Sequence, residues 1–154
     1  AGIRPQEVTR LTWNDIFLDT PSKVIKVRSM ASKTGGTRQV SICAALEAWL
    51  RIAPHQEDNS ICPPQWPVRW AGLRYRAGWD ANGKRWPNDA LRHTFASYHV
   101  LTHRDIPRLQ LEMGHSSSTQ IMHRYMNLSG VDQEMAERFW NIVPEEDFYA
   151  DRNA

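Results

Sequence analysis

The chain of 154 residues has no long hydrophobic run and very little cysteine. No stretch approaches the roughly 18 consecutive apolar residues that a membrane-spanning helix needs, which excludes such a helix. The first residues carry no signal-peptide pattern. Because Cys43 and Cys62 are the only cysteines, a disulfide framework is excluded and a reducing cytosol is favoured. With 41% hydrophobic and 23% charged residues, the composition is that of one globular domain and not of a disordered chain.

The net charge of +2 hides an asymmetry along the chain. Residues 131–154 hold seven acidic and two basic side chains and carry −5, so residues 1–130 carry +7. A basic body with an acidic tail favours an anionic partner such as nucleic acid, although a solvated charged surface gives the same bias.

Three short segments in the first 42 residues predict a small sheet beside a first helix. Pro5 can open a helix whose apolar positions reach Trp13. Alternation at residues 16–18, a β-branched run at 24–27 and alternation at 38–42 predict three antiparallel strands, the last two joined by a Gly-rich hairpin tip at 33–37.

The rest of the chain has helical periodicity, so we expect an α+β fold that is mainly α, a helical bundle with a small antiparallel three-stranded sheet. Apolar positions also place four tryptophans in the core: Trp13, Trp49, Trp70 and Trp140. Five helices are expected over residues 45–53, from Pro67 to Ala77, from Asn88 or Asp89 to Val100, from Asp105 to Gly114, and from Ser118 through Tyr125. A last helix is expected to start at a capping box of Ser129 and Asp132. Its apolar stripe consists of Val131, Met135, Phe139 and Ile142.

Four local motifs carry polar side chains suited to chemistry on a phosphate. They are Arg4 just before the first helix, Lys33 at the hairpin tip, Arg92 in Leu-Arg-His-Thr-Phe, and His115 in Met-Gly-His-Ser-Ser, followed ten residues later by Tyr125. Each motif is weak alone, since a lone surface Arg, Lys or Tyr is common. The ordered set of Arg, Lys, Arg, His and Tyr is more specific.

This set matches the needs of phosphodiester cleavage. Two guanidiniums can bind the non-bridging oxygens and hold the charge of the pentacovalent transition state. A tyrosine hydroxyl can attack phosphorus and form a covalent phosphotyrosine, and a lysine can protonate the leaving 5′ oxygen. A histidine adds a further donor. Because the protein supplies the cations, we expect no metal and no other cofactor.

In this order the motifs resemble the catalytic domain of the tyrosine recombinase (phage integrase) family over roughly residues 1–143. The resemblance implies DNA strand cleavage and rejoining in site-specific recombination or integration, through a 3′-phosphotyrosine. It assigns catalytic roles to Arg4, Lys33, Arg92, His115 and Tyr125. It also implies that Glu7 orients active-site side chains and that His93, next to the second arginine, is supporting and structural.

One position departs from the family pattern. Three residues before Arg92, where the family usually has His or Lys, this chain has Asp89. An ionised Asp cannot donate to a phosphate and would repel it, so Asp89 either caps a helix or marks a site that tolerates the loss. Two alternative functions stay open: a catalytically impaired DNA-binding relative, and a type IB topoisomerase-like DNA relaxer.

Five further basic side chains are candidates for DNA contact because they flank loop tryptophans: Arg69, Arg74, Arg76, Lys84 and Arg85. The tryptophans concerned are Trp66, Trp79 and Trp86. A metal site at His99 and His103, four residues apart, is the weaker alternative to a pair of half-exposed histidines.

The resemblance also sets expectations for organisation and partners. We expect residues 1–143 to form a catalytic domain that is N-terminally truncated and lacks the core-binding domain, and residues 144–154 to form an acidic C-terminal tail. The expected partner is double-stranded DNA, bound by a homo-oligomer (a tetramer) assembled through the C-terminal helix, with no membrane. A cytoplasmic setting in a bacterium, phage or mobile element is expected.

Overall fold

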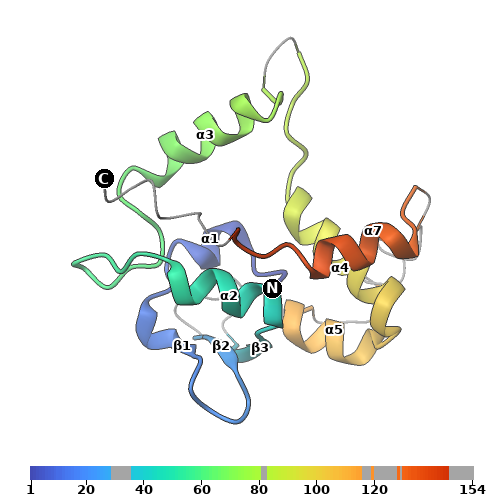
Figure 1. Ribbon diagram of the computed structural model, residues 1–154, viewed down its shortest axis with the longest axis horizontal. Helices are drawn as coiled ribbons and strands as arrows, with labels where there is room; N and C mark the ends of the chain where they lie inside the picture. The colour runs from blue at the N-terminus through green and yellow to red at the C-terminus, as the bar shows by residue number, and fades with distance from the viewer. Residues whose placement is uncertain (29–35, 81–82, 116–118, 120–127, 129, 146–154) are drawn as a thin grey trace.

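The computed structural model describes residues 1–28, 36–80, 83–115, 119, 128 and 130–145 (Figure 1). Lys33, Ser118, Tyr125 and Ser129 therefore lie outside the described residues, as does the helix expected from 118 through 125. The described elements are α1 (Pro5–Val8), the 3-10 helix η1 (Trp13–Asp15), β1 (Ile16–Phe17), β2 (Val24–Val27), β3 (Arg38–Ser41), α2 (Ala44–Ile52), α3 (Trp66–Arg76), α4 (Ala90–His103), α5 (Ile106–Met113) and α7 (Gln133–Trp140).

The strands form an antiparallel three-stranded sheet in the order β1-β2-β3, which confirms the predicted sheet. Ile25 pairs with Val40 at its centre, and both side chains are buried while Lys26 between the buried positions is exposed. This alternation turns one face of the sheet inward. There it packs with Leu11, and α2 covers the same core with Leu46 and Leu50, among other side chains.

A second core lies among the later helices. Phe95 and Ala96 of α4 pack against Leu109 and Met113 of α5, and α7 adds the partly buried Phe139 and Trp140. Figure 1 shows α4, α5 and α7 grouped beside the sheet with its helices α1 and α2. The mainly helical α+β fold is thus as expected, but it has two apolar cores with a seam between them.

The two ends of the predicted helical pattern need correction. The first helix ends at Val8, and Trp13 instead begins η1, where the Asp15 carboxylate accepts the Thr12 amide at 3.0 Å. The last helix begins at Gln133, because Asp132 is its N-cap and accepts the Met135 amide at 2.8 Å. Asp132 is therefore the cap itself and not the inner member of a capping box.

The buried face of α7 also differs from the predicted stripe. Ala136 is fully buried, whereas Met135 and Ile142 are 44% and 57% exposed. The reason is that the rings of Phe139 and Trp140 turn toward α4. There the centre of the Phe139 ring lies 4.8 Å from the centre of the Tyr98 ring. A small side chain at position 136 lets the two helices approach.

Helix α3 stands apart from both cores (Figure 1). None of its side chains is buried, and Leu73 is 43% exposed. The expectation that Trp70 is a core residue is therefore wrong. Its ring instead stacks on Trp66 at 5.7 Å and meets Trp86 edge-on at 5.5 Å. We call residues 66–80 and 83–86 the tryptophan arm.

The cysteines and the pair of histidines on α4 lie within the described residues. Both cysteines are free thiols. His99 is buried rather than half-exposed, and burial together with the nearby His103 lowers the pKa of His99 to about 4. In this part of the chain no three potential metal ligands come together, and no helix is long and apolar enough to cross a membrane.

The Asp132 cap yields a first prediction. Asp132→Ala should lower the free energy of unfolding by about 1 kcal/mol, because the Met135 amide of α7 loses its acceptor. Urea denaturation measures the change. Asp132→Asn keeps an acceptor and should retain most of the stability; an equal loss in both variants would show that the cap does not hold α7.

Candidate active site

The C-terminal end of α5 is the centre of the candidate site. Gly114 adopts a left-handed conformation with φ of 62°. Its amide donates to Leu111 O, and the His115 amide donates to Gln110 O, each at 3.1 Å. These two bonds form a Schellman turn, which ends the helix and turns the chain sharply. The turn leaves the carbonyls of residues 112–114 available to side chains.

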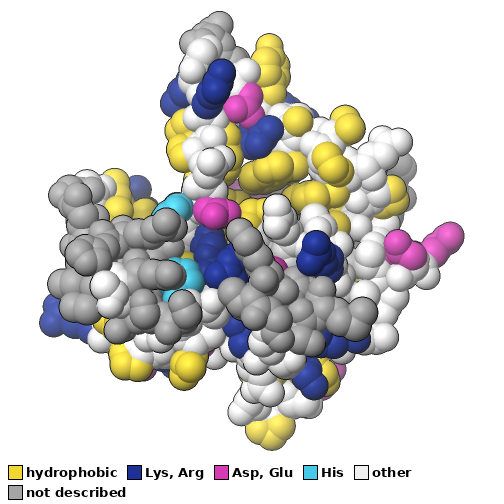
Figure 2. Space-filling view, turned by 180° about the vertical axis from the view of Figure 1, so that it is seen from behind, with side chains coloured by type: hydrophobic (Ala, Val, Ile, Leu, Met, Phe, Trp, Pro, Cys, Tyr) yellow, Lys and Arg dark blue, Asp and Glu magenta, His cyan; other side chains and the backbone are white. Residues whose placement is uncertain are grey.

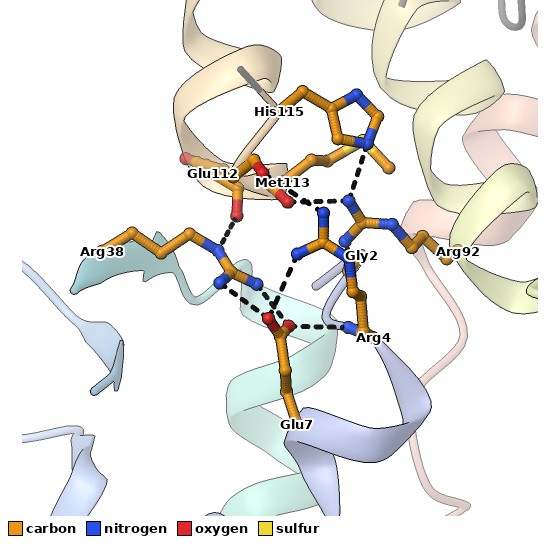
Figure 3. A network of polar contacts seen from close by, with 9 residues as sticks. Gly2, Arg4, Glu7, Arg38, Arg92, Glu112, Met113 and His115 are labelled. Atoms are coloured by element: carbon orange, nitrogen blue, oxygen red, sulfur yellow. Dashed lines mark hydrogen bonds and ion pairs between the residues drawn. The ribbon is translucent and has the colours of Figure 1, made fainter. Parts of the chain in front are cut away.

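Three consecutive carbonyls of this turn each accept a hydrogen bond from a different arginine (Figure 3). Glu112 O accepts from Arg38 Nε at 2.7 Å, Met113 O from Arg92 Nη2 at 2.7 Å, and Gly114 O from Arg4 Nη2 at 3.2 Å. The carbonyl end of a helix carries partial negative charge, which suits guanidinium donors. The turn thus brings together arginines from β3, α4 and the start of α1.

Glu7 is the second anchor of this cluster. It is 1% exposed, and its two carboxylate oxygens accept from Arg38 at 3.1 and 2.6 Å. Arg4 donates to the same carboxylate through its side chain and its backbone amide, each at 3.1 Å. Burial alone would raise the pKa of Glu7, but these hydrogen bonds and the two positive charges outweigh it and lower the pKa to about 2. Glu7 is therefore ionised at neutral pH.

Arg92 is the most enclosed of the three guanidiniums, with 4% exposure. One of its Nη groups donates to Gly2 O, and the other lies 2.8 Å from His115 Nε2 as well as bonding Met113 O. Gly2 allows this close approach, since a Cβ there would collide with the Phe95 ring. The guanidinium plane of Arg92 is thus fixed from two sides, with the His115 ring at its edge.

The charges of the cluster do not cancel. Arg4, Arg38 and Arg92 contribute three positive charges against one on Glu7, and Arg4 keeps 19% of its side chain exposed. A partly buried site with excess guanidinium charge and an imidazole is suited to bind an anionic group such as a phosphate.

The structure brings together four of the residues predicted from sequence: Arg4, Glu7, Arg92 and His115. His93 follows Arg92 on α4 and is half-buried. Lys33 and Tyr125 lie outside the described residues. The five further basic candidates lie on the tryptophan arm and not in this cluster: Arg69, Arg74, Arg76, Lys84 and Arg85.

Sequence reasoning missed Arg38, which is 9% exposed and bonds both Glu7 and α5. Its strand offered a signal. Arg38 is two residues before the buried Val40, so both side chains face the core side of the sheet. A charged residue at a core-facing position of a strand needs a buried partner of opposite charge, and here that partner is Glu7.

Asp89 occupies the N-cap position of α4, as one of the two hypotheses for it required. Its φ is 54°, and its carboxylate accepts no capping hydrogen bond from the helix. Asp89 is therefore at the position of a helix cap, but its side chain does not cap the helix.

The sequence profile of the phage integrase family matches residues 1–130, which is most of the chain. The chain belongs to the phage integrase family. No curated protein matches the chain significantly.

Solved structures of recombinases have the same fold as this phage integrase family member. The XerA recombinase matches with a TM-score of 0.59 at 19% identity, covering 99% of this chain and 54% of its own. The Tn1549 transposon integrase in complex with transposon right end DNA matches with a TM-score of 0.56 at 18% identity. The match covers 90% of this chain and 54% of the integrase chain. The XerH site-specific recombinase in a post-cleavage complex with palindromic difH substrate matches with a TM-score of 0.52 at 21% identity. The match covers 92% of this chain and 42% of the XerH chain. The chain thus spans about half the length of these proteins.

The shared carboxylate predicts how the stability of this phage integrase family member depends on pH. Glu7 has a folded pKa of about 2 against an ordinary value of 4.5, so the unfolded chain binds its proton first as the pH falls. Its contribution is complete above pH 4.5 and is lost on acidification toward pH 2. Glu7→Gln should cost about 3 kcal/mol at neutral pH and flatten the acid limb of the stability curve.

Urea denaturation across this pH range measures the effect. The matched control is Glu134→Gln, whose partner Arg138 is 77% exposed and whose own side chain is 73% exposed. It should change stability little. An acid limb as steep in Glu7→Gln as in the unaltered chain would contradict the assignment.

Gly114 yields a second prediction for the site. Gly114→Ala should cost about 1–2 kcal/mol for the left-handed backbone alone. It should cost more in total, because the new Cβ would lie 3.0 Å from Arg38 Cδ. Gly130→Ala is the control, with φ of 83° and open space around the Cβ. Equal losses by thermal denaturation would show that Arg38 gives way without cost.

Proposed function

We propose that this chain cleaves and rejoins DNA strands in site-specific recombination or integration, through a 3′-phosphotyrosine intermediate. The observation that carries the proposal is the convergence of Arg4, Arg92 and His115 on the α5 turn, in a chain of the phage integrase family. These three groups come from separate parts of the sequence and meet where one phosphate could contact all of them.

In the proposed mechanism, Arg4 and Arg92 bind the non-bridging oxygens of the scissile phosphate. Their donors are held in place before substrate arrives, so little reorganisation is needed as charge builds on the pentacovalent transition state. His115, at the edge of Arg92, supplies a further contact to the same phosphate. Glu7 positions Arg4 directly, and Arg38 positions Glu7.

The covalent step uses two residues outside the described part of the chain. The Tyr125 oxygen attacks phosphorus and forms the phosphotyrosine, while the bond to the 5′ oxygen breaks. Lys33 gives that oxygen its proton. In the reverse step a 5′ hydroxyl of another strand attacks the phosphotyrosine and releases Tyr125. The number of phosphoester bonds is conserved, so no nucleotide cofactor is needed, and the arginines supply the positive charge that a metal would otherwise provide.

The tryptophan arm supplies further phosphate contacts in this proposal. Arg69, Arg76, Lys84 and Arg85 are exposed there. Arg74 is more constrained, because it pairs with Asp80 at 2.8 Å and lies 5.9 Å from the Trp70 ring centre. Several such contacts would make DNA binding strongly salt-dependent. His93 is proposed as a supporting residue.

The wider organisation is also a proposal. Residues 1–143 would act as the catalytic domain and 144–154 as an acidic tail, within a longer recombinase that works in the cytoplasm on bacterial, phage or mobile-element DNA. The protein would assemble on DNA as a homo-oligomer. Helix α7 packs on α4 of its own chain, and its outer face, including Met135, is left for a neighbouring protomer.

Covalent trapping tests the proposed nucleophile. The protein is incubated with a pool of nicked duplexes of randomised sequence, and adducts are detected on a denaturing gel. Tyr125→Phe should bind DNA as before and form no adduct, because it lacks the attacking oxygen. Tyr98→Phe, a control on α4 that keeps the ring packed on Phe139, should form adduct normally. Adduct in Tyr125→Phe would overturn the assignment.

The same assay separates the enzyme from a catalytically impaired DNA-binding relative. Asp89 favours that second candidate, because an acid stands where a phosphate donor is expected. DNA binding without any adduct in the unaltered protein would support the impaired relative and overturn the enzyme.

A further inference from the structure

A cavity of about 540 Å³ adjoins the arginine cluster, between the tryptophan arm and the starts of α1 and α4. Its volume is in the range of small-ligand sites. Arg92, which belongs to the cluster, also lines this cavity. Figure 2 shows one side of the molecule, on which hydrophobic side chains gather next to Lys and Arg side chains.

The lining of the cavity is mainly apolar, and its largest side chains are tryptophans. Trp66, Trp70 and Trp86 line it. Trp66 and Trp70 are stacked with 19° between their planes, while Trp86 stands at 85° to Trp70. The three indole rings contact one another and so form one continuous aromatic wall of the cavity. Such rings stack on any planar π system, and nucleobases are planar π systems.

Besides Arg74 and Arg92, the polar residues that line the cavity are Asn88 and Asp89. The Asp89 carboxylate accepts no capping hydrogen bond from α4. An ionised carboxylate only accepts, so it suits an N–H donor and not a phosphate oxygen. The amino groups of cytosine and adenine are donors of this kind.

We propose that this cavity binds one unstacked base of the DNA strand whose phosphate lies on Arg4 and Arg92. The proposal rests on the proposed function. Arg92 is shared by cavity and cluster, so a nucleotide can place its phosphate on the arginines and its base among the tryptophans. Asp89 then accepts from an amino group of the base, which gives a physical reason for an acid three residues before Arg92.

Charge supports this occupant over an apolar protein segment. Arg74 lines the cavity, and Lys84 lies 4.3 Å from the Trp79 ring centre, beside Trp86. Cations around an aromatic slot are typical of sites for single-stranded nucleic acid. A base extruded from a duplex needs such a slot to offset the stacking that it loses.

The test compares three short duplexes at low salt by fluorescence anisotropy. One is fully paired, one carries a single bulged cytosine, and one a single bulged thymine. The full chain should bind the cytosine bulge about tenfold more tightly than the paired duplex, which is within the range for one base stacked on aromatic side chains. The thymine bulge should bind less tightly than the cytosine bulge, because thymine lacks the amino group.

Trp70→Leu should abolish the preference for a bulge, measured as the ratio of the affinities for the bulged and the paired duplex. The matched control is Trp13→Leu, because Trp13 stacks on His55 outside this cavity. That variant should keep the preference. Asp89→Leu should equalise the two bulges.

A second measurement needs no variant. A bulged 2-aminopurine, which stands for the extruded base, should lose fluorescence on binding as it stacks on tryptophan. Binding of all three duplexes with equal affinity, or a fluorescence gain, would overturn the cavity proposal alone. Failure to bind even the paired duplex would overturn the proposed function as well.

Discussion

The candidate site depends on the carbonyl end of one short helix. A helix leaves its last carbonyls without partners, and here three in a row, on residues 112–114, are taken by arginines from three other elements. Like charges would otherwise keep those guanidiniums apart. The partial negative charge of the helix end, held in place by the left-handed Gly114, makes their approach favourable.

Glu7 completes this balance and also joins the two cores. It comes from α1, beside the sheet core, and through Arg38 and Arg4 it is connected to the end of α5 in the helical core. A buried carboxylate bound by two arginines is favourable only while both remain. The seam between the cores is therefore polar and fixed where Glu7 bridges it, whereas an apolar cavity is lined from both cores elsewhere. A fixed polar seam suits catalysis better than an apolar one, because its donors need not be ordered when substrate binds.

Much of this could be predicted from the sequence, and what could not has physical reasons. Period-2 and period-3.6 patterns predicted the sheet and most helices, and local motifs predicted Arg4, Glu7, Arg92 and His115. Arg38 was missed because its importance comes from a partner 31 residues away. Trp70 was placed in the core because an apolar stripe does not show what it packs against. In α3 the partner is another tryptophan, not a core.

Asp89 shows how such departures can be used. As a phosphate ligand it is the wrong residue, since its charge repels the substrate, and as a helix cap it makes no hydrogen bond. Yet it lines, together with Arg92, a cavity that has three tryptophans in its wall. A residue that is unsuited to bind one group of a ligand can bind a neighbouring group of the same ligand. On a polynucleotide the phosphate and the base are such neighbours, and an acceptor suits the base where a donor suits the phosphate.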